Sequence, residues 1–438
     1  MLLNDRFKTP TVQAATSADT EQFKDMKIRI HRRLIDSIDL AKMDLMRSSE
    51  VVNQIRSVIE GLIIGEGVPL NQMERDRLVA EIQHETFGLG PLEPLLADDL
   101  VSDILVNNSS NVYIEKAGKL IKTEVCFRDD AHLMQIIERI VSKVGRRIDE
   151  SSPYVDARLP DGSRVNAIIP PLAIDGPVLS IRRFGREPLA MRNLIELETL
   201  DQRMAELLEG AVQTRLNILI SGGTGTGKTT LLNVLSAYIP EEERVVSIED
   251  SAELHLKQEH VVRLETRPSN LEGRGEVTSR DLLRNALRMR PDRIIIGEVR
   301  GGEALDLLQA MNTGHDGSLS TVHANTTRDA LSRLETMVLM AGVELPERAI
   351  KEQMASALNL VVQLVRFSDG TRKVVKLSEI TGMEGNTIVM HDVIVYQQKG
   401  IDREGKVIGE FRATGVRPRF AERFKLFGFD LPPRMFED

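Results

Sequence analysis

The chain has 438 residues, of which 41% are hydrophobic and 28% charged, with a formal net charge of -9. This composition excludes fibrous, collagen-like and wholly disordered proteins, and the acidic charge argues against a protein whose main task is to bind nucleic-acid backbones. The length predicts about two to four domains. The lone cysteine, Cys126, excludes an intrachain disulfide, and we expect it to be a small core residue.

The N-terminal region is predicted to be helical after a mobile tail at residues 1–20. Over residues 21–75 apolar side chains recur at helical spacing, which predicts a small bundle. Its basic residues His31, Arg32 and Arg33 are interpreted as a solvated face, with a docking surface for a partner as the alternative. No secretory signal is evident, and no apolar run reaches the roughly 20 residues of a membrane-spanning helix. We therefore expect a cytoplasmic protein without a transmembrane segment of its own.

A mixed α+β domain is predicted over residues 76–185. Gly and Pro around Phe87 break the helical pattern, and a helix with apolar residues from Leu133 to Val144 on one face lies among short strands. The predicted strands are 103–106, 112–115, 119–125, 165–168 and 178–182. Residues 186–195 are interpreted as a linker.

Residues 196–438 alternate strands and helices as a parallel α/β sheet does. The predicted strands are 216–221, 244–248, 293–296 and 318–322, and the predicted helices begin near residues 229, 279 and 327. The segment past Leu360 is β-rich and then becomes basic and aromatic. That final stretch contains Arg417, Arg419, Phe420, Arg423, Phe424 and Phe427.

A phosphate-binding loop is predicted directly after the first of these strands. Residues 222–229 match G-x-x-x-x-G-K-[ST] at every fixed position. Lys228 can reach β- and γ-phosphate oxygens, and the Thr229 hydroxyl can bind Mg²⁺. The predicted nucleotide-binding residues of the loop and of the helix start are Gly222, Gly223, Thr224, Gly225, Thr226, Gly227, Lys228, Thr229 and Thr230.

Acids at two strand ends are candidates for hydrolytic chemistry, which needs a carboxylate to orient water. Glu298 follows the third strand, which we expect beside the strand of the phosphate loop, and Glu249 ends the second strand, followed by Asp250 and Glu253. An ordinary Walker B motif carries Asp where this chain has Gly297, so Mg²⁺ support comes through water or from elsewhere. Helix capping is the alternative for each acid. We favour function for Glu298 and Glu249 because adjacent strands end in acids on the phosphate side.

Two histidines, His315 and His323, lie in the segment 314–325. Zinc binding is not favoured, because no cysteine and no His-Glu-x-x-His spacing accompanies them. We interpret His323 as a polar sensor that touches the nucleotide or links it to the neighbouring strand. A structural histidine is the alternative, more so for His315.

Four segments, in this order, resemble the Walker A, Asp-box, Walker B and His-box motifs of the type II/type IV secretion ATPases. They are residues 222–229, 248–254, 290–300 and 314–325. Residues 87–96, 101–104 and 156–166 extend the likeness into the preceding domain. The sequence is similar to the CpaF/TadA branch, which powers tight-adherence (Flp-type) pilus assembly, and the likeness covers roughly residues 75–430.

The resemblance implies a RecA-like motor domain behind an N-terminal domain, in a homohexameric ring that binds ATP between domains and subunits. By position it implies that Lys228 and Thr229 bind phosphate and Mg²⁺. It implies further that Glu298 is the catalytic glutamate, Glu249 the Asp-box acid and His323 the His-box residue. A stroke across the linker would act on an inner-membrane platform protein, so that the motor is docked peripherally at the inner membrane.

The resemblance also implies that arginines of the N-terminal domain act on the nucleotide. The matching positions are Arg158, Arg164, Arg182 and Arg183. Guanidinium groups suit the spread charge of a transferring phosphoryl group, and Arg164 and Arg182 are our candidates for a catalytic role. Pairing with local acids on a strand face is the alternative, and which arginine touches phosphate stays open.

Other classes of protein remain as alternatives. A nucleic-acid-translocating RecA-like motor is opposed by the net charge of -9, the absence of Trp and the presence of only 4 Tyr, and only the C-terminal Arg/Phe stretch favours it. We therefore expect no direct nucleic-acid contact. A non-hydrolysing scaffold is suggested by the missing Walker B Asp, although Gly-Glu is what the resembled family carries there. A type IV secretion ATPase for DNA or effector export is the third alternative.

Overall fold

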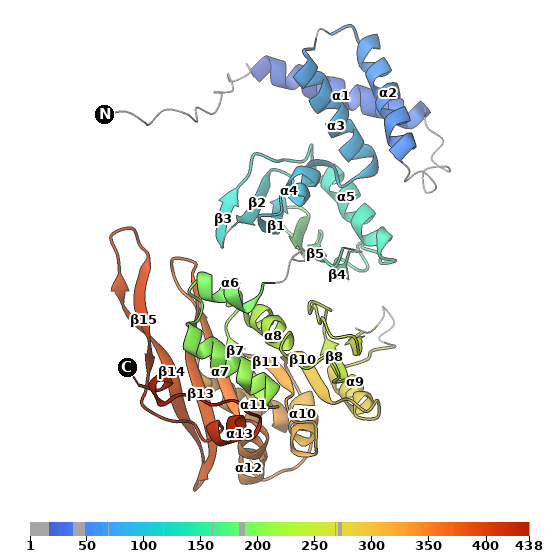
Figure 1. Cartoon of the computed structure of the whole chain (residues 1–438). Coiled ribbons are helices and arrows are strands. Elements are labelled where there is room, and N and C mark those ends of the chain that lie inside the picture. The colour runs from blue at the N-terminus through green and yellow to red at the C-terminus, as the bar shows by residue number, and fades with distance from the viewer. Residues whose placement is uncertain are drawn as a thin grey trace, which may run out of the picture. The chain divides into compact units, whose positions relative to one another are not determined.

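The computed structural model describes residues 17–37, 49–68, 70–116, 118–159, 161–183, 189–267, 269 and 274–437. Contacts divide the chain into two compact units, and each is described by itself (Figure 1). The first comprises residues 1–115, 120–159 and 165–181, and the second residues 116–119, 160–164 and 182–438. Residues 1–16 of the predicted tail and 186–188 of the predicted linker lie outside the described residues.

The first unit begins with three helices that share one apolar core. These are α1 (Ser17–Ser37), α2 (Ser49–Gly65) and α3 (Gln72–Phe87). Ile30 of α1, Ile59 of α2 and Leu78 of α3 are fully buried against one another. The helical spacing of apolar residues thus predicts this region well, and α1 starts within the range that we predicted as a tail. None of the helices in the described part of the chain combines the length and apolar character that crossing a bilayer requires.

A six-stranded sheet in the order β3-β2-β1-β6-β5-β4 follows. The helix α5 packs its apolar face, including Leu133 and Ile137, on this sheet. Strand β4 lies where the sequence pattern gives no strand. The bounds are β1 Val101–Asn108, β2 Asn111–Lys116, β3 Lys119–Lys122, β4 Tyr154–Arg158, β5 Arg164–Ile168, β6 Val178–Arg182, η2 Gly90–Leu92, α4 Glu93–Ala97 and α5 Asp130–Lys143.

The prediction that Cys126 is a core residue is wrong, because its side chain is exposed. Strand β3 ends at Lys122, and in the loop after it the neighbouring Phe127 takes the inward position. The Phe127 ring lies edge-on to the ring of His132, with 5.6 Å between centroids. The larger apolar side chain therefore occupies the core and the thiol faces outward.

A buried carboxylate ties α1, α3 and α5 together. Glu85 of α3 is 8% exposed, and its Oε2 lies 2.9 Å from Nε2 of His132. The ammonium of Lys27 lies 3.2 Å from Oε1 of the same carboxylate. Burial alone would raise the pKa of Glu85, but the hydrogen bond with His132 and the charge of Lys27 outweigh it and lower the pKa from 4.5 to about 2. The ionised carboxylate thus stabilises the folded first unit.

We expect Glu85→Gln to weaken the first unit in a pH-dependent way. Since the folded-state pKa lies below the unfolded value, the stabilisation is complete above about pH 4.5 and is lost as the pH falls toward 2. Acid unfolding followed by circular dichroism should show a loss of about 3 kcal/mol in this window for the wild type and a flatter profile for the variant. Glu60→Gln, which removes an exposed pair with Arg56, is the control and should follow the wild type. Matching profiles for Glu85→Gln and wild type would contradict this account.

The second unit is built on a nine-stranded sheet in the order β15-β14-β13-β12-β7-β11-β10-β8-β9. Strands β12, β7, β11, β10, β8 and β9 are parallel, and β13, β14 and β15 extend the sheet as an antiparallel ribbon (orange to red in Figure 1). The strand bounds are β7 Ile218–Gly222, β8 Val245–Glu249, β9 Val261–Glu265, β10 Arg293–Val299, β11 Leu319–His323, β12 Leu360–Arg366, β13 Arg372–Glu384, β14 Thr387–Ile401 and β15 Val407–Ala413.

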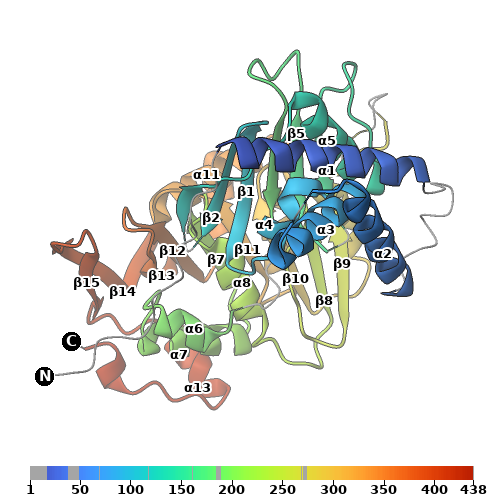
Figure 2. The same cartoon turned by 90° about the horizontal axis from the view of Figure 1, so that it is seen from above.

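Helices cover both faces of this sheet. One apolar core contains residues of α6, α7, α8 and α13, and a second contains residues of α9, α10, α11 and α12. Figure 2 shows α6, α7 and α13 gathered on one side. The bounds are α6 Met191–Glu196, α7 Gln202–Gln213, α8 Lys228–Ser236, α9 Ser279–Ala286, α10 Glu303–Asn312, α11 Thr327–Leu339, α12 Glu347–Ala357, α13 Ala421–Leu426 and η3 Pro433–Met435. Buried parallel strands between two helical layers confirm the predicted α/β class.

The second unit corrects two further predictions, one on the order of the strands and one on the extent of the linker. Strand β11 lies between β7 and β10, so the expectation that Glu298's strand is beside the strand of the phosphate loop is wrong. A short apolar strand after a helix carries no sign of its place in a sheet, which explains the error. Met191 and Leu194 of α6 are buried in this unit's core, so the described end of the predicted linker is part of the unit.

The basic and aromatic C-terminal stretch contributes to the core. Phe424 of α13 is fully buried and Phe420 is 6% exposed. The Phe424 ring lies directly against α7 at Gly210, where an added Cβ would stand 2.4 Å from a ring carbon. The glycine in the middle of α7 is thus explained by the close approach of this ring.

Gly210→Ala is therefore expected to destabilise the second unit although Ala favours helices. The clash with Phe424 should cost about 1–3 kcal/mol and outweigh a helix-propensity gain of about 1 kcal/mol. Thermal unfolding of the variant checks this. In a Phe424→Leu background the same substitution should cost less, since the ring that it meets is gone. A neutral or stabilising Gly210→Ala would contradict the packing.

Candidate functional site

The phosphate loop connects the buried strand β7 to α8. Gly225 and Gly227 adopt positive φ angles of 69° and 96°, which residues with a Cβ reach only with strain. The Lys228 ammonium donates to the Gly223 carbonyl at 2.9 Å, and Nε of Arg372 on β13 donates to the Gly225 carbonyl at 2.8 Å. Burial lowers the pKa of Lys228, and the charge of Glu298 opposes this shift. The loop thus surrounds a half-buried cation at the start of a helix.

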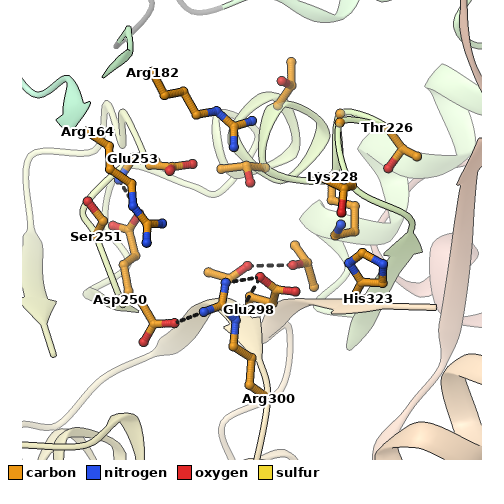
Figure 3. A pocket seen from close by; sticks show the side chains of 18 of the residues that line it. Arg164, Arg182, Thr226, Lys228, Asp250, Ser251, Glu253, Glu298, Arg300 and His323 are labelled. Atoms are coloured by element: carbon orange, nitrogen blue, oxygen red, sulfur yellow. Dashed lines mark hydrogen bonds and ion pairs between the residues drawn. The ribbon is translucent and has the colours of Figure 1, made fainter. Parts of the chain in front are cut away.

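A cavity of about 580 Å³ opens over this loop (Figure 3). All residues that line it belong to the second unit as contacts define it. The predicted residues among them are Thr224, Gly225, Thr226, Gly227, Lys228, Thr229, Thr230, Glu249, Glu298, His323, Arg164 and Arg182. Asp250, Ser251, Glu253, Gly297, Arg300, Thr321 and Arg333 line it as well. Most side chains proposed for the site from the sequence are therefore brought together.

Four predicted residues are not among the lining side chains. A Cβ at Gly222 would stand 2.5 Å from the hydroxyl of Thr226, and Gly223 supplies the carbonyl that Lys228 contacts, so both have a backbone role in the loop. Arg158 lies in β4 and Arg183 directly after β6. Of the four candidate arginines, the structure brings Arg164 and Arg182 to the cavity.

Glu298, Arg300 and Asp250 form an ion-pair network on one wall of the cavity. Nη2 of Arg300 lies 2.6 Å from Oε2 of Glu298, and Nη1 lies 2.9 Å from Oδ2 of Asp250. Burial disfavours the Arg300 cation, but the two carboxylates outweigh it and raise the Arg300 pKa. Sequence reasoning assigned no role to Arg300. Its position two residues after Glu298, directly beyond the end of β10, was the available signal.

Glu249 is the last residue of β8 and forms hydrogen bonds with the chain that follows this strand. It is 3% exposed, and its Oε2 accepts the N–H groups of Glu253 at 2.6 Å and Leu254 at 2.9 Å. Burial raises the pKa of Glu249, although the two N–H donors oppose the shift. Its Oε1 is buried and has no hydrogen-bond partner in the described structure. The geometry is that of a buried acid that orders the chain after β8 through two backbone hydrogen bonds.

The position of Glu249 also accounts for Gly297. A Cβ on Gly297 would lie 3.2 Å from Cγ of Glu249, across the parallel pair β8 and β10. An Asp at 297, as in an ordinary Walker B motif, would therefore compete for space with Glu249. The small residue at 297 and the acid at 249 are two parts of one arrangement.

His323 and His315 lie at opposite ends of β11. His323 pairs in register with Gly222 at the start of the phosphate loop and lines the cavity. His315 precedes the strand, and its carbonyl accepts the Ser318 hydroxyl at 2.7 Å. Thr321 of the same strand donates to the carbonyl of Gly297 at 2.7 Å. Strand β11 thus links the phosphate loop to the segment that carries Glu298.

The side chains present fit a cation held mainly by phosphate. No group of three or more His, Cys, Asp or Glu side chains in the described segments is arranged to bind a metal by itself. Thr229, the second residue of α8, carries a hydroxyl next to Lys228. Glu298 and Asp250 line the same cavity. Mg²⁺ prefers few protein ligands together with phosphate oxygens and water, and this set of donors suits it.

These features define the class of the protein. A G-x-x-x-x-G-K-[ST] loop after a buried parallel strand, with an acid on a strand of the same sheet, is the site of a P-loop nucleotide-binding protein. A family model described as Type II/IV secretion system protein matches residues 85–411, and one described as Type II secretion system protein E, N-terminal domain, matches residues 23–86. The chain therefore belongs to the type II/IV secretion system ATPase family.

Similar proteins agree with this family. A putative conjugal transfer protein of Mycobacterium tuberculosis is 37% identical over 310 residues, which cover 69% of this chain and 88% of that protein. The type IV secretion system protein VirB11 of Bartonella henselae is 32% identical over 331 residues, covering 66% and 91%. The crystal structure of the pilus retraction motor PilT with bound ADP has a TM-score of 0.50 at 20% identity, covering 67% of this chain and 83% of that one, and shows a shared fold.

Glu249 gives a direct test of the site geometry. We expect Glu249→Gln to keep ATP affinity within about threefold, because a neutral amide retains an oxygen acceptor for the N–H groups of Glu253 and Leu254. Glu249→Ala leaves both N–H groups unpaired, at a cost of about 1–3 kcal/mol, and should lower the melting temperature and the affinity. Titration with a fluorescent ATP analogue measures the binding. If Gln is as harmful as Ala, the negative charge of Glu249 is required and a catalytic role gains support.

Proposed function

We propose that this chain hydrolyses ATP and uses the energy to drive a secretion or pilus-assembly machine. The convergence of Lys228, Glu298 and two arginines on one cavity is the observation that carries this proposal. A site that only bound nucleotide would not need a carboxylate on the wall that faces the phosphate loop. Family membership supports the same conclusion.

The proposed mechanism assigns each side chain one task. The loop N–H groups and Lys228 bind the triphosphate, and the Thr229 hydroxyl holds Mg²⁺. When bound, Mg²⁺ neutralises charge on the β- and γ-phosphate oxygens. Glu298 orients the attacking water, and Arg164 or Arg182 stabilises the charge that develops on the phosphoryl group. His323 contacts the nucleotide from the strand beside the loop.

The proposal extends to a homohexameric ring docked on the cytoplasmic side of the inner membrane. Arg164 and Arg182 complete the site on closure, and the part of the predicted linker (186–195) that precedes α6 absorbs the movement that follows hydrolysis and release. The stroke acts on a platform protein of the membrane machine. Support for this part comes from the motif resemblance and from family membership.

Tight-adherence pilus assembly is the transport process that we propose, on the similarity of the sequence to the CpaF/TadA branch; the four ordered motifs support only the wider family. Conjugative or type IV secretion is the second candidate, and the names of the relatives from Mycobacterium tuberculosis and Bartonella henselae favour it. A nucleic-acid-translocating motor has less support, because two of the three Phe residues of the basic stretch, Phe420 and Phe424, are buried and cannot stack on bases, which leaves only Phe427 exposed among them. An unchanged hydrolysis rate on addition of single- or double-stranded DNA at low salt would agree with this ranking.

Glu298→Gln should bind ATP with nearly wild-type affinity but turn it over about 100-fold more slowly, since the amide cannot accept a proton from water. Lys228→Ala should lose both binding and turnover. Steady-state phosphate release and nucleotide titration separate the two effects. Wild-type turnover by Glu298→Gln would remove the water-orienting assignment.

Turnover per subunit across a protein dilution series tests the shared site. Specific activity should rise steeply with concentration if subunits complete one another's sites. A flat profile down to concentrations at which sizing shows monomer would contradict the ring mechanism. Absence of turnover in the wild type without its membrane partner would favour a scaffold or a platform-activated motor.

A further inference from the structure

Arg300 makes contacts that the proposed mechanism does not yet use. Two of its donors contact the same oxygen of Glu298, Nη2 at 2.6 Å and Nε at 3.1 Å. A third, Nη1, lies 2.9 Å from Oδ2 of Asp250 (Figure 3). The guanidinium therefore joins the end of β8 to the acid that faces the phosphate loop.

The backbone that carries Arg300 is held in place as well. Oε1 of Glu303, a residue 8% exposed, accepts the N–H groups of Arg300 at 2.6 Å and of Gly301 at 2.9 Å. The next residue, Gly302, approaches Ala341 so closely that an added Cβ would lie 3.0 Å from its Cα. The turn between β10 and α10 is thus fixed by hydrogen bonds on one side and by packing on the other.

Asp250 restrains the guanidinium from its other side. Its second oxygen, Oδ1, lies 3.3 Å from the Thr266 hydroxyl, which follows β9. A planar guanidinium bound along two edges to two carboxylates has its plane fixed, whereas a lysine ammonium in its place would act as a point charge without that orientation. One oxygen of Glu298 is consequently clamped, and the rotation of its carboxyl group is restricted.

We propose that Arg300 is a positioning residue for ATP hydrolysis. It holds the Glu298 carboxylate by Oε2 so that Oε1 is presented to the attacking water, and Asp250 in turn orients Arg300. This inference rests on the proposed function, since Glu298 must be the group that orients water. In many enzymes a catalytic base is oriented by a further side chain, and here Arg300 would orient Glu298 in this way. A displacement of about 1 Å at a reacting group costs on the order of 100-fold in rate.

Several charged groups surround Glu298 in the cavity. Lys228 of α8 and Arg300 of β10's turn are the nearby cations, and Arg333 of α11 lines the same cavity. Glu249 and Asp250 lie at the end of β8, and His323 at the end of β11. The remaining charged groups that line the cavity are Glu253, Arg164 and Arg182. Arg300 forms a direct ion pair with the Glu298 carboxylate, so its removal releases Oε2 of Glu298 from this restraint.

The experiment compares Arg300→Gln, Arg300→Lys and Asp250→Asn in the full chain. We expect Arg300→Gln to lower kcat about 10- to 100-fold while ATP affinity stays within about threefold. Arg300→Lys should recover only a small part of kcat, because it restores the charge without the orientation. Asp250→Asn should lower kcat about three- to tenfold. Arg348→Gln, which removes an exposed pair with Glu352 on α12, is the matched control and should behave as the wild type.

Two readouts separate positioning from a general structural effect. The loss in Arg300→Gln should fall on kcat and leave KM within about threefold of the wild type, and Arg300→Lys should not rescue it, whereas a general structural effect would change both parameters. In a Glu298→Gln background, Arg300→Gln should cause little further loss, since it acts through the group that is already disabled.

Each contrary result has a defined meaning. Wild-type kcat in Arg300→Gln, or a full second loss in the Glu298→Gln background, overturns the inference. A higher kcat overturns it in favour of a restraint that keeps Glu298 from water. A raised KM with unchanged kcat overturns it in favour of a phosphate contact. No turnover in the wild type, equal to Lys228→Ala, contradicts the proposed function itself and the inference with it.

Discussion

The arrangement of the site depends on the parallel alignment of β7, β11, β10 and β8, whose carboxyl ends lie at one edge of the sheet. The phosphate loop leaves β7, His323 ends β11, Glu298 lies near the end of β10 and Glu249 ends β8. Residues that are more than a hundred positions apart in the chain thereby face one cavity. Because these strands are buried on both faces, the helices that cover them fix the edge as a rigid platform for the loops.

At this edge, a side chain on one strand limits what the neighbouring strand can carry. Glu249 occupies room that a side chain at Gly297 would need, and it takes up the N–H groups of the following loop. Two of the other acids that line the cavity, Glu298 and Asp250, are both held by Arg300. The buried acid supports the backbone, while the acids that Arg300 contacts line the opening. Burial is what divides these roles between residues of the same chemical type.

Much of this could be predicted from the sequence, because the signals are local. The phosphate loop follows from eight consecutive residues, and the α/β class follows from short apolar runs between amphipathic segments. The order of the strands is not local, and β11 lies where the sequence pattern gave no reason to place it. Arg300 and Arg333 were missed as site residues for the same reason, since Arg300 gains its role from Asp250 beyond another strand and Arg333 reaches the cavity from a helix far along the chain. The reversal of Cys126 and Phe127 shows how a loop without periodicity hides which side chain turns inward.

Arg372 connects the antiparallel ribbon of the second unit to the phosphate loop. It opens β13, the first strand of the antiparallel ribbon, and its guanidinium grips the carbonyl of Gly225 inside the phosphate loop. A displacement of the start of β13 would therefore reach the loop directly through this hydrogen bond, besides the path through the paired strands β12 and β7. The antiparallel ribbon is in this way part of what holds the phosphate loop in its conformation.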